Sequence, residues 1–274
     1  MARDETTPRH RRFGCFILPL AGIIGVVLGL CNLSYKSSYV APGIYPTPDT
    51  SFIGRRTQVH LLREKADTAV IFIGGFGDQT TANFRCVYEG MPPLPGCGKQ
   101  VRAYYAWDGA EGSLFEHSTA SIQQDITAFL ELNPGANLIF IGHSYGGSAT
   151  MDIIRNLKLR PENATIVVTL DAVSCRERSC PRERAPEVDF WINSYCAPYR
   201  TAGDIVPKLG GPWRHCEQAD VNLCFNGKER ASDGRRYQHK RPYPLFMDAY
   251  GSGSSAYALL QNVCRSIICI PLED

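Results

Sequence analysis

The chain has 274 residues, of which 44% are hydrophobic, and a formal net charge of +2. A charge so close to balance gives no reason to expect a nucleic-acid partner. The eleven cysteines are many for a cytosolic enzyme and favour export to an oxidising compartment.

The N-terminal part differs from the rest of the chain. Residues 1–12 are polar and rich in arginine, and residues 13–33 carry no charge. At 1.5 Å per residue the uncharged segment is about 31 Å long, close to the hydrocarbon thickness of a bilayer. We expect a transmembrane signal anchor at 13–33, with residues 1–12 in the cytoplasm and the remainder on the exported side, periplasmic or extracellular. A cleaved signal peptide is the alternative, although no small-x-small cleavage site follows the segment.

The remaining chain alternates between strand and helix patterns. Residues 34–56 contain several prolines and read as a linker, so one catalytic domain is expected over 57–274. We expect strands at 57–63, 68–73, 99–107, 138–141, 164–170, 188–195 and 221–225, and helices at 117–132, after the 138–141 strand, and at 254–265. This alternation predicts an α/β fold with a mostly parallel sheet and helices on both faces.

The most informative motif follows the strand at 138–141. It reads Gly142-His143-Ser144-Tyr145-Gly146, a Gly-x-Ser-x-Gly pattern between a strand and a helix. In that setting the turn is sharp, the flanking glycines let strand and helix approach closely, and the serine hydroxyl stands at the edge of the sheet. Ser144 is therefore the candidate nucleophile.

A serine nucleophile needs a base to take its proton. The strand-turn-helix setting predicts the chain order serine, acid, histidine, and only His215 and His239 follow the motif. His239 lies between the last expected strand and the closing helix, where the base usually lies in this architecture. His239 is therefore preferred, and His215 remains the alternative.

The acid that orients the base has two serious candidates. Asp171 ends the strand at 164–170, so its carboxylate would emerge at the carboxyl edge of the sheet. Asp204 lies on the loop after the next strand, which is the commoner position for the acid. Asp152 is too near Ser144 in sequence to orient a distant base.

The oxyanion of an acyl-transfer reaction needs two backbone donors. The amide of Tyr145, directly after the nucleophile, is one candidate. The second is expected from the glycine-rich turn after the strand at 68–73, where Phe76 presents the amide. This turn lacks the glycine spacing and the lysine of a nucleotide-binding loop.

At these residues the chain resembles the α/β-hydrolase family, within it the lipase and esterase branch, over roughly residues 57–265. The segment Gly74-Gly75-Phe76-Gly77-Asp78 looks like the lipase His-Gly-Phe oxyanion turn, with glycine in the place of histidine. The segment Leu170-Asp171-Ala172 looks like the Leu-Asp-Pro stretch of lipases, with alanine in the place of proline. This likeness is the main reason to choose Asp171 over Asp204.

The resemblance implies a membrane-anchored serine hydrolase that cleaves carboxylic esters through an acyl-enzyme, with Ser144, His239 and Asp171 as the triad. An ester or lipid-like small molecule is the expected substrate, and no cofactor or metal is expected. An acyltransferase or thioesterase would use the same triad. A hydrolase-fold domain without activity, serving as a binding module, is the alternative of another class.

The cysteines outside the uncharged segment fall mostly into neighbouring pairs. We expect small-loop disulfides, with Cys196 left over. The expected pairs are Cys86–Cys97, Cys175–Cys180, Cys216–Cys224 and Cys264–Cys269. Their spacing does not match zinc ribbons or fingers, so a metal site is the weaker interpretation.

Overall fold

The computed structural model describes residues 64–75, 78, 83–105, 119–173, 183–199, 204–251 and 253–268. The expected anchor at 13–33, the linker at 34–56 and the strand at 57–63 lie outside these residues. Within the described part, no helix has both the length and the apolar character that a membrane crossing requires.

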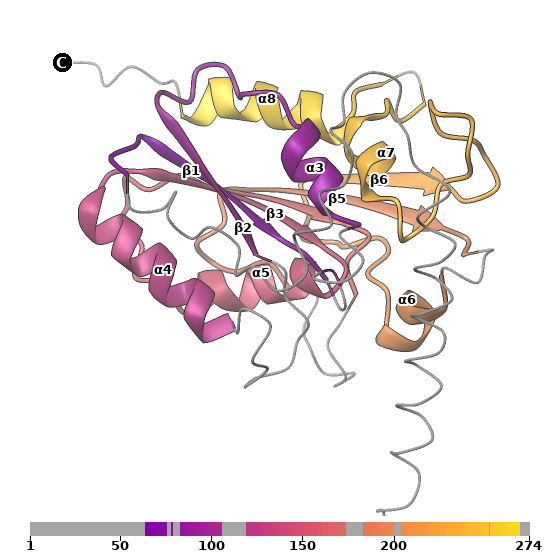
Figure 1. Cartoon of the computed structure of the whole chain (residues 1–274), viewed down its shortest axis with the longest axis horizontal. Coiled ribbons are helices and arrows are strands. Elements are labelled where there is room, and N and C mark those ends of the chain that lie inside the picture. The colour runs from indigo at the N-terminus through magenta and orange to yellow at the C-terminus, as the bar shows by residue number, and fades with distance from the viewer. Residues whose placement is uncertain are drawn as a thin grey trace, which may run out of the picture. The chain divides into compact units, whose positions relative to one another are not determined.

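The described residues build one sheet whose strands are all parallel to their neighbours. The strands are β1 (Thr68–Ile73), β2 (Gln100–Tyr105), β3 (Asn137–His143), β4 (Thr165–Leu170), β5 (Phe190–Ala197) and β6 (Val221–Asn226). They are arranged in the order β2-β1-β3-β4-β5-β6 (Figure 1). The parallel sheet predicted from the sequence is thus confirmed, with strand ends shifted by a few residues.

Helices cover both faces of this sheet, as predicted. They are α3 (Arg85–Gly90), α4 (Thr119–Leu132), α5 (Tyr145–Arg155), α6 (Ile205–Gly210), α7 (Pro242–Met247) and α8 (Ala256–Ile267). In Figure 1, α3, α7 and α8 lie on one side of the sheet, and α4 and α5 lie on the other. The sequence did not indicate α3, α6 and α7, because six residues are too few to display a helical period.

Strand β1 explains why the strand sequences read as continuous apolar runs. Val70 and Phe72 join a core that also contains Leu260 of α8, whereas Ile71 and Ile73 join a second core on the opposite face. A strand covered on both faces needs apolar side chains at every position. Every residue of β1 is accordingly buried.

The strand order changes direction beside β1. The chain passes from β1 to β2 on one side, and β3 then pairs with the other side of β1. The loops that follow β1 and β3 therefore diverge at the carboxyl edge of the sheet, which is where ligand sites form in open parallel sheets. Gly75 and Ser144 lie on these two loops.

Candidate active site

Ser144 occupies a strained turn between β3 and α5. Its backbone dihedrals are φ 56° and ψ −127°, a region that costs about 1–3 kcal/mol for a residue with a side chain. Glycines make the turn possible: a Cβ on Gly142 would lie 2.7 Å from the carbonyl oxygen of Gly146, and one on Gly146 would lie 2.1 Å from that of Ile73. The predicted strand-turn-helix setting is therefore present, and the surrounding structure keeps the serine in this strained conformation at the edge of the sheet.

His239 reaches Ser144 from the loop after β6. Its Nε2 lies 2.9 Å from Ser144 Oγ, and its Nδ1 lies 2.8 Å from Asp171 Oδ2. The three side chains form one hydrogen-bonded chain across residues that are far apart in sequence. His215, the alternative base, is exposed on the segment that precedes β6.

Asp171 directly follows β4 and is fully buried. Its Oδ1 accepts hydrogen bonds from the Cys196 backbone amide at 3.1 Å and from the Tyr199 hydroxyl at 2.9 Å. Burial, followed by the nearby Asp171 charge, raises the pKa of Tyr199, so this phenol keeps its proton and donates a hydrogen bond to the carboxylate. Oδ2 is thereby left directed at His239. Nothing in the sequence pattern pointed to Tyr199.

Asp204, the alternative acid, supports the same histidine at a different place. Its Oδ1 accepts a hydrogen bond from the backbone amide of His239 at 3.1 Å. Asp171 contacts the imidazole ring, whereas Asp204 contacts the main chain of the same residue. The two carboxylates therefore have different positions at the site, although the likeness to lipases was the only reason that the sequence offered to choose between them.

His143 contacts the backbone of the loop that carries His239. Its Nε2 lies 2.8 Å from the carbonyl oxygen of His239, and its ring centroid lies 5.7 Å from that of Phe84 and 4.9 Å from that of His239. Burial, together with the neighbouring His239, lowers the pKa of His143 to about 3, so this ring is neutral at physiological pH. Because the carbonyl can only accept, Nε2 carries the proton, and Nδ1 is buried with no hydrogen-bond partner among the described residues.

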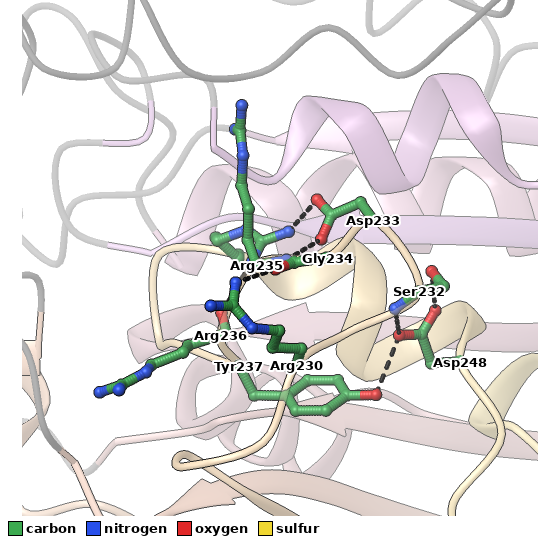
Figure 2. Close-up of polar contacts among 9 residues, drawn as sticks. Arg230, Ser232, Asp233, Gly234, Arg235, Arg236, Tyr237 and Asp248 are labelled. Atoms are coloured by element: carbon green, nitrogen blue, oxygen red, sulfur yellow. Dashed lines mark hydrogen bonds and ion pairs between the residues drawn. The ribbon is translucent and has the colours of Figure 1, made fainter.

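The loop after β6 is held by polar contacts within it and by contacts with Asp248, which directly follows α7. Asp248 accepts hydrogen bonds from the Ser232 amide at 2.8 Å, the Ser232 hydroxyl at 2.6 Å and the Tyr237 hydroxyl at 3.0 Å (Figure 2). Arg241, two residues after the histidine of the site, forms an ion pair with Asp233. These contacts restrict the conformations of the loop that carries His239, and none of them involves the His239 ring.

The backbone after β1 runs directly against the candidate nucleophile. A Cβ on Gly75 would lie 2.4 Å from Ser144 Cβ and 2.9 Å from its Oγ. Only glycine therefore fits beside the serine at this point. Tyr145, the first proposed oxyanion donor, begins α5 immediately after Ser144. Phe76, the second, lies outside the described residues.

Asp78 anchors this glycine turn from within the protein. Its Oδ1 accepts the Phe84 amide at 2.9 Å, and its Oδ2 accepts the Tyr104 hydroxyl. A Cβ on Gly74 would lie 2.1 Å from Oδ2, so the carboxylate packs against the turn itself. Burial raises the pKa of Asp78 to about 6, although its hydrogen bonds act in the opposite direction.

The expected cysteine pairs require correction. Cys86 and Cys97 are both thiols, and the Cys86 thiol instead donates a hydrogen bond to the Asn83 carbonyl at 3.0 Å. Cys216 and Cys224 are not bonded to each other either. Nearness in sequence was a poor guide here, because the fold determines which thiols meet. The pairs Cys175–Cys180 and Cys264–Cys269 include residues outside the described ranges.

Comparisons with known proteins give only partial likenesses. No protein-family model matches the chain, and no curated protein matches it. One similar structure is a lipase-esterase related protein from Clostridium acetobutylicum, with 16% identity over 42% of this chain and 45% of that one, and a TM-score of 0.26. Another is a candidate cell surface hydrolase from Lactobacillus plantarum, with 11% identity over 74% of this chain and 92% of that one, and a TM-score of 0.35. The chain thus spans less than half the length of the first of these structures.

Proposed function

We propose that this protein is a serine hydrolase of the α/β-hydrolase type that cleaves carboxylic esters through an acyl-enzyme. One observation carries the proposal: the hydrogen-bonded chain from Ser144 through His239 to Asp171, at 2.9 and 2.8 Å, at the carboxyl edge of a parallel sheet. A nucleophile, a base and an orienting acid in this geometry form the arrangement required for nucleophilic acyl transfer.

In the proposed acylation step, Ser144 Oγ attacks the ester carbonyl as its proton passes to His239 Nε2. Asp171 accepts a hydrogen bond from Nδ1–H, holds the ring in the required tautomer and stabilises the imidazolium that forms. His239 then gives the proton to the departing alcohol. The acid part of the substrate is left on the serine as an ester.

In the proposed deacylation step, water replaces the alcohol and the same proton transfers occur again. Both steps pass through a tetrahedral oxyanion, for which the amide of Tyr145 and that of Phe76 are the proposed donors. The closeness of Gly75 to Ser144 supports a donor from the turn after β1.

Labelling with a fluorophosphonate probe tests the nucleophile. The parent should be labelled, and Ser144→Ala should not, provided that circular dichroism shows both to be folded. His239→Ala should lose labelling as well. His215→Ala is the matched control, because this histidine is exposed on the segment before β6. Loss of labelling in His215→Ala alone would refute the assignment of the base. A folded parent that never reacts would favour a binding module without activity.

Product analysis separates hydrolysis from transfer. An acyltransferase or thioesterase would use the same three side chains and differ in the acceptor or in the thiol released. With a chromogenic ester and no added acceptor, a hydrolase forms free acid and alcohol at equal rates. Acid formation that falls when an alcohol acceptor is added would indicate a transferase.

We also propose that residues 13–33 anchor the protein in a membrane with the catalytic part on the exported side. The uncharged segment and the arginines before it support this proposal. A lipid-like ester would then be available beside the enzyme. Protease treatment of cells from which any outer membrane has been removed, before and after the inner membrane is permeabilised, tests the orientation, since an exported domain is cleaved before permeabilisation. Protection of the domain equal to that of a cytoplasmic marker would contradict the proposal.

A further inference from the structure

Two cysteines that are far apart in sequence meet in the core above the sheet. Cys97 precedes β2, and Cys264 lies on α8. Both are thiols in this structure, both are buried, with 1% and 0% of their surfaces exposed, and both belong to the core between the sheet and α8. The side chains of Cys97 and Cys264 share a hydrogen bond. Their sulfur atoms are therefore neighbours in the folded protein.

The surrounding contacts hold the two backbones in this relation. The Tyr257 hydroxyl, on the buried face of α8, donates a hydrogen bond to the Pro93 carbonyl at 3.4 Å. The carbonyl of Cys97 accepts a hydrogen bond from Thr68 Oγ1 of β1 at 2.8 Å. One contact ties the helix to the segment before β2, and the other ties that segment to the sheet.

We propose that Cys97 and Cys264 form a disulfide that joins the C-terminal helix to the edge of the sheet. The proposal does not depend on the proposed enzymatic activity. It replaces the expected bonds of Cys97 to Cys86 and of Cys264 to Cys269. The bond would close a loop of roughly 170 residues, the kind of long loop for which the chain-entropy model gives a large stabilisation.

The oxidation needs an electron acceptor, which is a disulfide donor such as a thiol oxidoreductase or oxidised glutathione. The Cys97 thiolate attacks one donor sulfur, which forms a mixed disulfide and releases the first donor thiolate. The Cys264 thiolate then attacks the Cys97 sulfur and releases the second. Two protein thiols are oxidised to one disulfide, and one donor disulfide is reduced to two thiols. Because the folded protein buries both sulfur atoms, this exchange takes place as the chain folds.

Peptide mapping of the full chain tests the pairing directly. The reduced, denatured protein is refolded in a glutathione buffer, remaining thiols are alkylated, and the digest is analysed without reduction. We expect a cross-linked peptide that joins Cys97 to Cys264. Recovery of both residues as alkylated thiols, or of either bonded to another cysteine, would overturn the proposal.

A stability measurement gives a second readout. Reduction of the parent should lower its Tm by about 5–15 °C, from the usual value of a native disulfide and the size of the domain. The double variant Cys97→Ser, Cys264→Ser should lack this component of the shift. Cys86→Ser is the matched control, because it removes a neighbouring core thiol and should keep both the cross-linked peptide and the shift. A full shift in the double variant would contradict the proposal, whereas mapping of the parent remains decisive if that variant does not fold.

Discussion

Replacing Asp78 with asparagine should change how the stability of this protein depends on pH. Asp78 is 3% exposed, and burial raises the pKa of its carboxyl group from the ordinary 3.8 to about 6. That difference corresponds to about 3 kcal/mol between the folded and unfolded states. Asparagine keeps an acceptor for the Phe84 amide and offers its NH2 group to the Tyr104 oxygen, so the variant removes the charge without leaving either partner alone.

The direction in which stability changes with pH follows from proton linkage. Between pH 3.8 and 6 the folded protein binds a proton at Asp78 that the unfolded chain has released. The contribution of Asp78 to stability is therefore fully present below about pH 4 and lost as the pH rises through 6. The asparagine variant lacks this loss. Relative to the parent, we expect its free energy of unfolding to rise by about 3 kcal/mol between pH 4 and pH 7.

Urea unfolding of the parent and the variant at several pH values measures this difference. Tyr104→Phe is the informative second variant, because the Tyr104 hydrogen bond lowers the Asp78 pKa. Its removal should make the pH-dependent loss larger than in the parent. Parallel stability profiles for the parent and Asp78→Asn, or a difference that shrinks as the pH rises, would refute the reasoning.

Four other substitutions test the site, each measured as kcat on a chromogenic ester. Asp171→Asn should lower kcat by about a thousandfold or more, because it disturbs the tautomer of the His239 ring. Asp204→Asn should lower kcat by about tenfold, because Asp204 accepts a hydrogen bond from the backbone amide of His239 and not from its ring. A larger loss of kcat in Asp204→Asn than in Asp171→Asn would contradict the assigned roles. Gly75→Ala should lower kcat at least about a hundredfold, because the new methyl group would lie 2.4 Å from Ser144 Cβ, and wild-type activity would show that the turn yields easily. Tyr199→Phe should lower kcat by about tenfold through the lost hydrogen bond to Asp171, and an unchanged rate would show that the Cys196 amide orients the carboxylate by itself.

The strands and the turn at Ser144 could be predicted from the sequence because each depends on residues that are adjacent in the chain. Buried strands such as β1 and β3 appear as short apolar runs, and Gly142 and Gly146 mark a turn that a larger residue would block. The short helix α7 was missed, since Pro242 and Pro244 within six residues hide any helical period.

What the sequence by itself determined was the alternating α/β class and the candidate serine between a strand and a helix. The tertiary structure decided which distant groups surround that serine: His239 at its hydroxyl, Asp171 on the ring, and Tyr199 behind the carboxylate. It also set Cys97 beside Cys264, where spacing along the chain had suggested nearer partners. The physical reason is that strand order brings the carboxyl ends of distant strands to one edge, and no local pattern of side chains records that order.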